Sequence, residues 1–141
     1  MEALDLTKHR PRSGWAQLDG LYMLPRTIDK MRALLPGGNI GQYKIPGFSS
    51  LVLKELEIDE ERFRNAVAAA SSEDDVAEWL RENADTTKYE AINAKLLSRT
   101  IEAISRNNPD YFTNYPLAKD LPKDTIHFDV LDKDDDRIYS T

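Results

Sequence analysis

The feature that most constrains the fold is a succession of helix start and stop signals between residues 25 and 116. Prolines, glycines and polar residues suited to capping a helix recur at short intervals along this stretch. Between them, apolar residues recur at helical spacing, whereas the alternation typical of strands is scarce. We therefore predict an all-α fold of about five to seven helices, with residues 1–141 forming a single compact domain.

Within that domain we expect three segments. Residues 1–24 should form an irregular arm, because Pro11, Gly14 and Gly20 interrupt it. Residues 25–119 should form the helical body, and residues 120–141 an acidic C-terminal segment. The arm should be packed, since exposing its apolar side chains to water would be costly. These side chains are Leu4, Leu6, Trp15, Leu18 and Leu21.

The first helix should begin at Pro25 and end near Leu35. The following "PGGNIG" is predicted to be a helix stop and turn, because its glycines follow a helix and lack the spacing of a phosphate-binding loop. A single long helix is predicted from Tyr89 to Ile104, because the apolar residues of this stretch fall along one side of a helix. Residues 125–131, "TIHFDVL", fit either a short helix or a strand.

Composition excludes several classes of protein. There is no cysteine, so disulfides, thiolate nucleophiles and Cys-ligated metals are ruled out. The start, "MEALDLTKHRPRSGW", lacks the apolar core of a signal peptide, and no apolar run reaches the ~18 residues of a membrane span. We therefore expect a cytoplasmic protein with no membrane partner. We also expect no nucleic-acid partner, because no basic stripe is interleaved with stacking aromatic residues.

The best candidate for a site is "LPRTIDKMRALLPGGNIGQYKIPG", residues 24–47. On a helix, its charged residues lie opposite the apolar face, and Asp29 can pair with Arg26 and with Arg32 at a spacing of three. Cations held beside a carboxylate can receive an anionic group, with arginine supplying a bidentate fork. Taken as chemistry alone, the pattern favours an ordinary solvated helix face. The candidate residues are Arg26, Asp29, Lys30, Arg32 and Tyr43.

Three other motifs carry less chemistry. His9 and His127 lack ligand partners at helical spacing, so we expect them to be structural or surface residues, and we expect no metal or cofactor. "DKDDDR", residues 132–137, begins like a calcium-binding loop, but Arg137 replaces the glycine, so we expect a solvated acidic turn. "PDYFTNYP", residues 109–116, is typical of the edge of a core.

Three separated motifs occur in the order found in a known family. They are "LDLTKHRPRS" at 4–13, "LPRTIDKMRALL" at 24–35 followed by "GQY" at 41–43, and "FDVLDKDDDR" at 128–137. Through them, nearly the whole chain resembles the bacterial domain-of-unknown-function family 5069. The resemblance implies a small, soluble, mainly helical bacterial protein and implies no activity. The sequence departs from the family pattern at Ile45, where a cysteine is common, and at Asp136, where a glycine is usual.

The resemblance places Pro25 and all five candidate residues within the family's own signature. Polar residues kept at a surface for a reason usually bind or lock something, so the solvated face is no longer the favoured interpretation of the candidate residues.

Three hypotheses follow for these charges. In a binding module, Arg26 and Lys30 accept an anionic small molecule or an acidic protein segment, and Asp29 orients them. In a structural ion network, the same charges tie the arm, or the acidic segment with Asp132 and Asp134, to the helix. In an enzyme, Asp29 or Tyr43 transfers a proton and Arg26 stabilises an oxyanion, although no nucleophile–base pair or metal set is visible.

Overall fold

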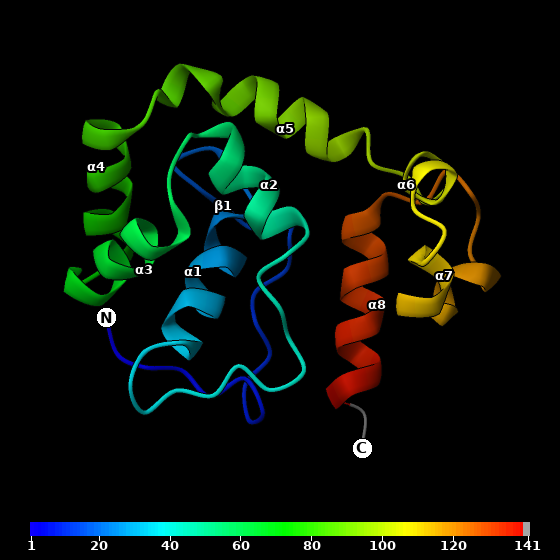
Figure 1. Cartoon of the computed structure of the whole chain (residues 1–141), viewed down its shortest axis with the longest axis horizontal. Coiled ribbons are helices and arrows are strands. Elements are labelled where there is room, and N and C mark those ends of the chain that lie inside the picture. Colours follow the sequence, from blue (N-terminus) through cyan, green and yellow to red (C-terminus); the bar gives the residue numbers. More distant parts are fainter. Residues whose placement is uncertain (140–141) are drawn as a thin grey trace. The chain divides into compact units, whose positions relative to one another are not determined.

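The computed structural model describes residues 1–139, and the chain divides into two compact units (Figure 1). Unit 1 comprises residues 1–92 and unit 2 begins at residue 93. In chain order, the elements up to the boundary are β1 (Gln17–Leu18), β2 (Leu21–Tyr22), α1 (Leu24–Ala33), α2 (Phe48–Glu55), α3 (Glu60–Ala69), α4 (Glu73–Asn83), the 3-10 helix η1 (Thr86–Lys88) and α5 (Tyr89–Leu97), which crosses it. Those of unit 2 are α6 (Ile101–Asn107), α7 (Tyr111–Asn114), η2 (Pro116–Asp120) and α8 (His127–Tyr139).

The mainly helical fold is confirmed, but two details of the prediction are wrong. Residues 1–139 contain eight α-helices rather than five to seven, and a two-stranded hairpin interrupts the arm that was expected to be irregular. The hairpin turns at Asp19 and Gly20, which have φ angles of 54° and 83°. Asp-Gly is a strong signal for such a turn, because both central residues must adopt positive φ. The single compact domain stays a prediction.

The long helix predicted from Tyr89 to Ile104 is in fact two helices. The chain leaves helical geometry at Thr100 (φ −91°, ψ 168°), whose side chain accepts a hydrogen bond from the Ala103 amide and caps α6. Thr100 also forms an antiparallel bridge with Ile126, and the Ile101 amide donates to the Thr125 carbonyl at 3.0 Å. Pairing with a segment distant in sequence therefore outweighs local helical periodicity here.

Residues 125–131 enter a helix, α8, which begins at His127 directly after this bridge. The same helix contains "DKDDDR", so the expectation of an acidic turn at 132–137 is wrong. The predicted acidic segment, 120–141, includes residues 140 and 141, which lie outside the described residues.

Unit 1 is built around α1, which packs against α2, α3 and the hairpin. All of α1 except Arg32 is buried, so this helix needs cover on every side. Met23 precedes it with φ 69°, which costs a non-glycine residue ~1–2 kcal/mol but lets the buried Met23 amide donate to the Gly14 carbonyl. At the other end, Gly38 passes so close to α1 that a Cβ would lie 2.6 Å from the Ala33 carbonyl oxygen. The predicted helix stop at the "PGGNIG" stretch is confirmed.

The arm covers one side of α1. Leu6 and Leu21 are buried as expected, and the main chain of the arm is bonded to the segment after α1, with the Leu6 amide donating to the Asn39 carbonyl at 2.8 Å. Trp15 contradicts the expectation of a packed arm, because it is 36% exposed, and its ring meets that of Tyr22 in a T-shaped arrangement. The irregular arm is therefore held by backbone bonds as well as by apolar packing.

Unit 2 has its own small core, formed by Ile101, Tyr111, Ala118 and Val130. The "PDYFTNYP" stretch contributes to it, as expected. His127 is buried beside it, and its Nδ1 atom shares a hydrogen bond of 3.0 Å with the Tyr111 hydroxyl. None of the helices in the described chain is long and apolar enough to cross a membrane.

Two buried tyrosines provide a matched test of this packing. The Tyr89 hydroxyl is buried and has no hydrogen-bond partner among the described residues, whereas the Tyr111 hydroxyl bonds to His127. Tyr89→Phe should leave the free energy of unfolding unchanged or raise it by up to ~1 kcal/mol, and Tyr111→Phe should lower it by ~1 kcal/mol. Urea unfolding of both variants checks this. Equal losses in the two variants would contradict the assignment of the hydrogen bonds.

Tyr89 also predicts an alkaline effect. Burial raises the pKa of Tyr89 to about 12, the nearby Asp19 carboxylate adds to the rise and Arg81 opposes it. In the unfolded chain this hydroxyl ionises near ~10. Above about pH 10 the unfolded chain ionises Tyr89 more readily than the folded protein does. Wild type therefore keeps its full stability below about pH 10 and loses part of it as the pH rises to about 12. The advantage of Tyr89→Phe over wild type should be constant from about pH 7 to 9 and grow by ~1–2 kcal/mol by about pH 12.

Candidate functional site

The charged residues of α1 are buried. Arg26 is 1% exposed, Asp29 4% and Lys30 8%. The solvated helix face, which residue chemistry alone favoured, is therefore wrong. Removing such groups from water costs several kcal/mol per charge unless each is paired or hydrogen-bonded, so their partners decide what this region does.

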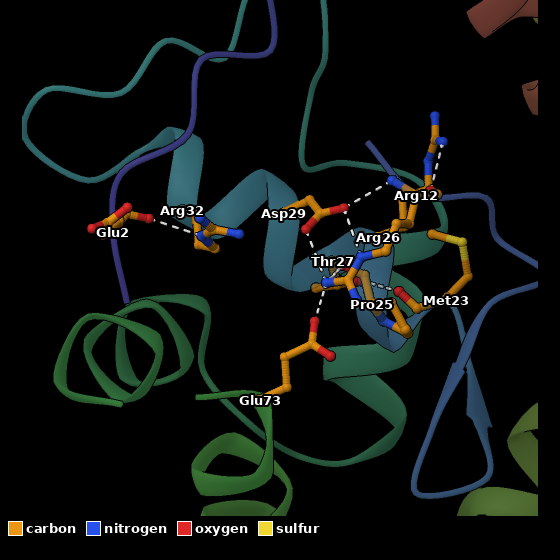
Figure 2. A network of polar contacts seen from close by, with 9 residues as sticks. All are labelled: Glu2, Arg12, Met23, Pro25, Arg26, Thr27, Asp29, Arg32 and Glu73. Carbon is orange, nitrogen blue, oxygen red and sulfur yellow. Dashed lines mark hydrogen bonds and ion pairs between the residues drawn. The ribbon is translucent and has the colours of Figure 1, made fainter. Parts of the chain in front are cut away.

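Asp29 is bound by Arg12, a residue of the arm (Figure 2). Oδ2 of Asp29 accepts from the Arg12 amide at 2.8 Å and from Nε at 3.1 Å, and Oδ1 accepts from Nη2 at 3.0 Å. This is the bidentate fork that arginine forms with carboxylates, strengthened by a main-chain donor. The predicted pairing of Asp29 with Arg26 and Arg32 is wrong, because in the described chain both carboxylate oxygens bond to Arg12.

Arg12 also contacts Glu73, the first residue of α4, through Nη2. The same nitrogen donates to the Pro25 carbonyl at 3.3 Å. Burial by itself lowers the pKa of Arg12, but the hydrogen bonds to Asp29 and Glu73 more than offset it, so the pKa is raised and the charge is permanent. The Arg12 side chain is 40% exposed and that of Glu73 32%, so the fork is buried on its Asp29 side only.

The remaining cations of α1 donate to main-chain carbonyls of irregular segments. Arg26 Nη1 lies 3.2 Å from the Arg12 carbonyl oxygen, and Lys30 Nζ lies 2.9 Å from that of Lys44. Both cations face the ring of Tyr43, with Arg26 Cζ at 5.5 Å and Lys30 Nζ at 6.0 Å from its centroid. Such cation–π contacts gain strength where water is excluded.

Arg32 lies apart from this group. It is partly exposed, and its Nε donates to the Glu2 carbonyl at 2.8 Å (Figure 2). The structure thus brings Arg26, Asp29, Lys30 and Tyr43 together around the arm, while Arg32 holds the beginning of the arm at the other end of the helix.

Sequence reasoning missed Arg12 and Glu73. The only signal for Arg12 was the basic run "KHRPR", residues 8–12, next to a helix whose single carboxylate stands among cations. Nothing in the sequence indicates that Glu73 comes close to either. Elsewhere in residues 1–139, no group of three or more His, Asp or Glu side chains is arranged to hold a metal ion. His9 is exposed, and His127 bonds within its own unit.

Comparison with known proteins identifies the family. The model of the family described as a domain of unknown function (DUF5069) matches residues 8–137, and the chain belongs to this family. The resemblance drawn from the three motifs is confirmed. No curated protein matches the chain.

The two arginine–aspartate forks of unit 1 allow a controlled test of the buried one. Asp29→Asn keeps the size of the side chain but removes its charge, and should lower the free energy of unfolding by ~2 kcal/mol, because three hydrogen bonds to a buried carboxylate weaken together. The matched control is Asp19→Asn. Asp19 is forked by Arg81 at 3.1 Å on the exposed surface, and asparagine tolerates its positive φ.

The control should change the unfolding free energy by less than ~1 kcal/mol. Thermal and urea unfolding of both variants in the same buffer provide the measurement. If the two substitutions cost the same, burial of the Arg12–Asp29 contact does not add to stability, and the network interpretation of α1 is lost.

Proposed function

We propose that this member of the DUF5069 family is a binding module in which the charges of α1 form a structural ion network. The network fixes the arm on unit 1 and holds Arg12 at the surface, where it receives a carboxylate from an acidic protein segment. In this proposal, Arg26, Asp29, Lys30 and Tyr43 position the contact residue, and Arg32 anchors the start of the arm.

One observation carries the proposal. Asp29 accepts hydrogen bonds from Nε and Nη2 along one edge of the Arg12 guanidinium, while the Arg12 side chain remains 40% exposed. Nη1 makes no hydrogen bond to any described residue. A guanidinium carries five donors in a fixed fork, so holding one edge leaves the other oriented and ready to bind. A group that is already oriented loses little entropy when a ligand arrives.

Glu73 supports the choice of ligand. Its carboxylate contacts Nη2 from the outer side of the guanidinium. The position is therefore electrostatically suited to a carboxylate, and arginine forks suit carboxylates because the two planar groups match.

The contacts of Asp29 argue against extending the proposal to catalysis. A general base needs an oxygen that can take a proton from substrate. Both oxygens of Asp29 already accept from Arg12.

Binding of an acetylated tetra-glutamate peptide, measured by calorimetry at an ionic strength of about 0.01 M, tests the proposal, since surface charges are weakly screened there. Arg12→Gln should weaken binding at least ~10-fold, equivalent to ~1.4 kcal/mol, and Arg12→Lys should weaken it less, because lysine keeps the charge but not the fork.

Arg81→Gln is the matched control, because Arg81 is also forked by an aspartate and carries the same charge. It should bind the peptide as wild type does. Circular dichroism checks that each variant is folded. Absence of binding by folded wild type, or equal binding by Arg12→Gln and Arg81→Gln, would contradict the proposed site.

A further inference from the structure

We infer that Glu73 is an internal competitor for Arg12, so that an acidic segment binds by displacing the Glu73 carboxylate from the guanidinium. This inference rests on the proposed function and adds its regulation: the first turn of α4 sets how readily the site opens. Two carboxylates, those of Asp29 and Glu73, share this one arginine.

The inner carboxylate is fixed. Asp29 is 4% exposed and receives three hydrogen bonds from Arg12, one of them from the main chain. A ligand replacing Asp29 would have to enter the packed side of α1 and displace the arm itself. The inner edge of the fork is therefore not the place where exchange occurs.

The outer carboxylate can be exchanged. Glu73 has a single ion pair in the described chain, to Nη2 of Arg12, and its side chain is 32% exposed. Ion pairs between partly solvated side chains contribute little net stability, because water solvates both partners once they separate. A carboxylate arriving from solvent therefore has only a weak contact to displace, although Glu73 has the advantage of belonging to the same chain.

Helix α4 keeps its first turn without this contact. Asp74 and Asp75 remain near the positive end of the helix after Glu73 swings away. Asp75 Oδ2 also accepts from the Ser71 amide at 2.9 Å, which ties the residue before the N-cap, Ser72, to the first turn of the helix. Release of Glu73 thus leaves the fold in place and removes its carboxylate from Nη2, which still donates to Asp29 and to the Pro25 carbonyl. An incoming carboxylate then meets Nη1 and the positive charge of the guanidinium without competition from Glu73.

The occupant we assign is a glutamate- or aspartate-bearing protein segment, because the group already seated at Arg12 is a glutamate side chain carried by a helix. Inorganic phosphate shares the negative charge and hydrogen-bond acceptors of such a segment but lacks a chain. It therefore forms the second arm of the test.

The test compares Glu73→Gln with Asp74→Asn in binding the tetra-glutamate peptide. Both substitutions remove one negative charge from the first turn of α4, but Asp74 is exposed and does not contact Arg12. Asp74→Asn therefore measures the general loss of repulsion and should tighten binding by less than ~2-fold. Glu73→Gln should tighten it by about 5-fold, because it also removes the competitor.

The outcomes separate the inference from the proposed function. Tighter binding by Glu73→Gln than by Asp74→Asn supports the inference when Arg12→Gln in the Glu73→Gln background removes the gain, and a gain that survives Arg12→Gln overturns it. Equal effects of the two substitutions overturn the inference but leave Arg12 as the site. No binding by any of these folded proteins overturns both. A gain seen with inorganic phosphate and not with the peptide overturns the assignment of a protein segment.

Discussion

The contact between Arg12 and Asp29 is the interaction on which the arrangement around α1 depends. An ionised carboxylate that is 4% exposed needs strong donors close by, and one residue of the arm supplies three of them. Because one of the donors is the Arg12 main-chain amide, the contact fixes the path of the chain as well as the side chain. The arm then covers α1, which packs against α2 and α3 elsewhere. A helix buried on nearly all sides can thus carry charges, since its charged side faces a segment shaped to bind them.

The cations of α1 share a second role. Arg26, Lys30 and Arg32 each donate to a main-chain carbonyl of a segment outside the helices, at Arg12, Lys44 and Glu2 respectively. Irregular segments lack the regular partners that helices and sheets give to their carbonyls, so a carbonyl that is turned toward the protein needs a donor from a side chain. A charged donor bonds more strongly than a neutral one. The cations therefore allow an irregular arm and the turn at residues 39–44 to lie against a buried helix.

The sequence predicted what local signals determine. The mainly helical content and the stop after α1 follow from periodicity and from glycine residues at the right offsets. The Asp19-Gly20 pair carries an equally local signal for a turn. Contacts between distant residues could not be found in this way. The partner of Asp29 lies seventeen residues away in the arm, and the break at Thr100 depends on pairing with Ile126. Burial of Arg26 and Lys30 follows from the same contacts, so a sequence that resembles a solvated face forms part of the core. A cytoplasmic location stays a prediction.

Arg12 already contacts both Asp29 and Glu73, and this limits how tightly the proposed site can bind a ligand. A carboxylate that replaces Glu73 exchanges one ion pair for a similar one, so the charge contact gives orientation and specificity more than affinity. Apolar contact beside the arginine would therefore add affinity. Trp15 follows three residues later in the arm, is 36% exposed, and forms a T-shaped pair with Tyr22, with 5.7 Å between the ring centroids. Tryptophan and arginine are the residues that most often carry binding energy at protein interfaces. A partner segment with an acidic residue for Arg12 and an apolar one for Trp15 would use both properties of the arm, while the buried network keeps the arm in place.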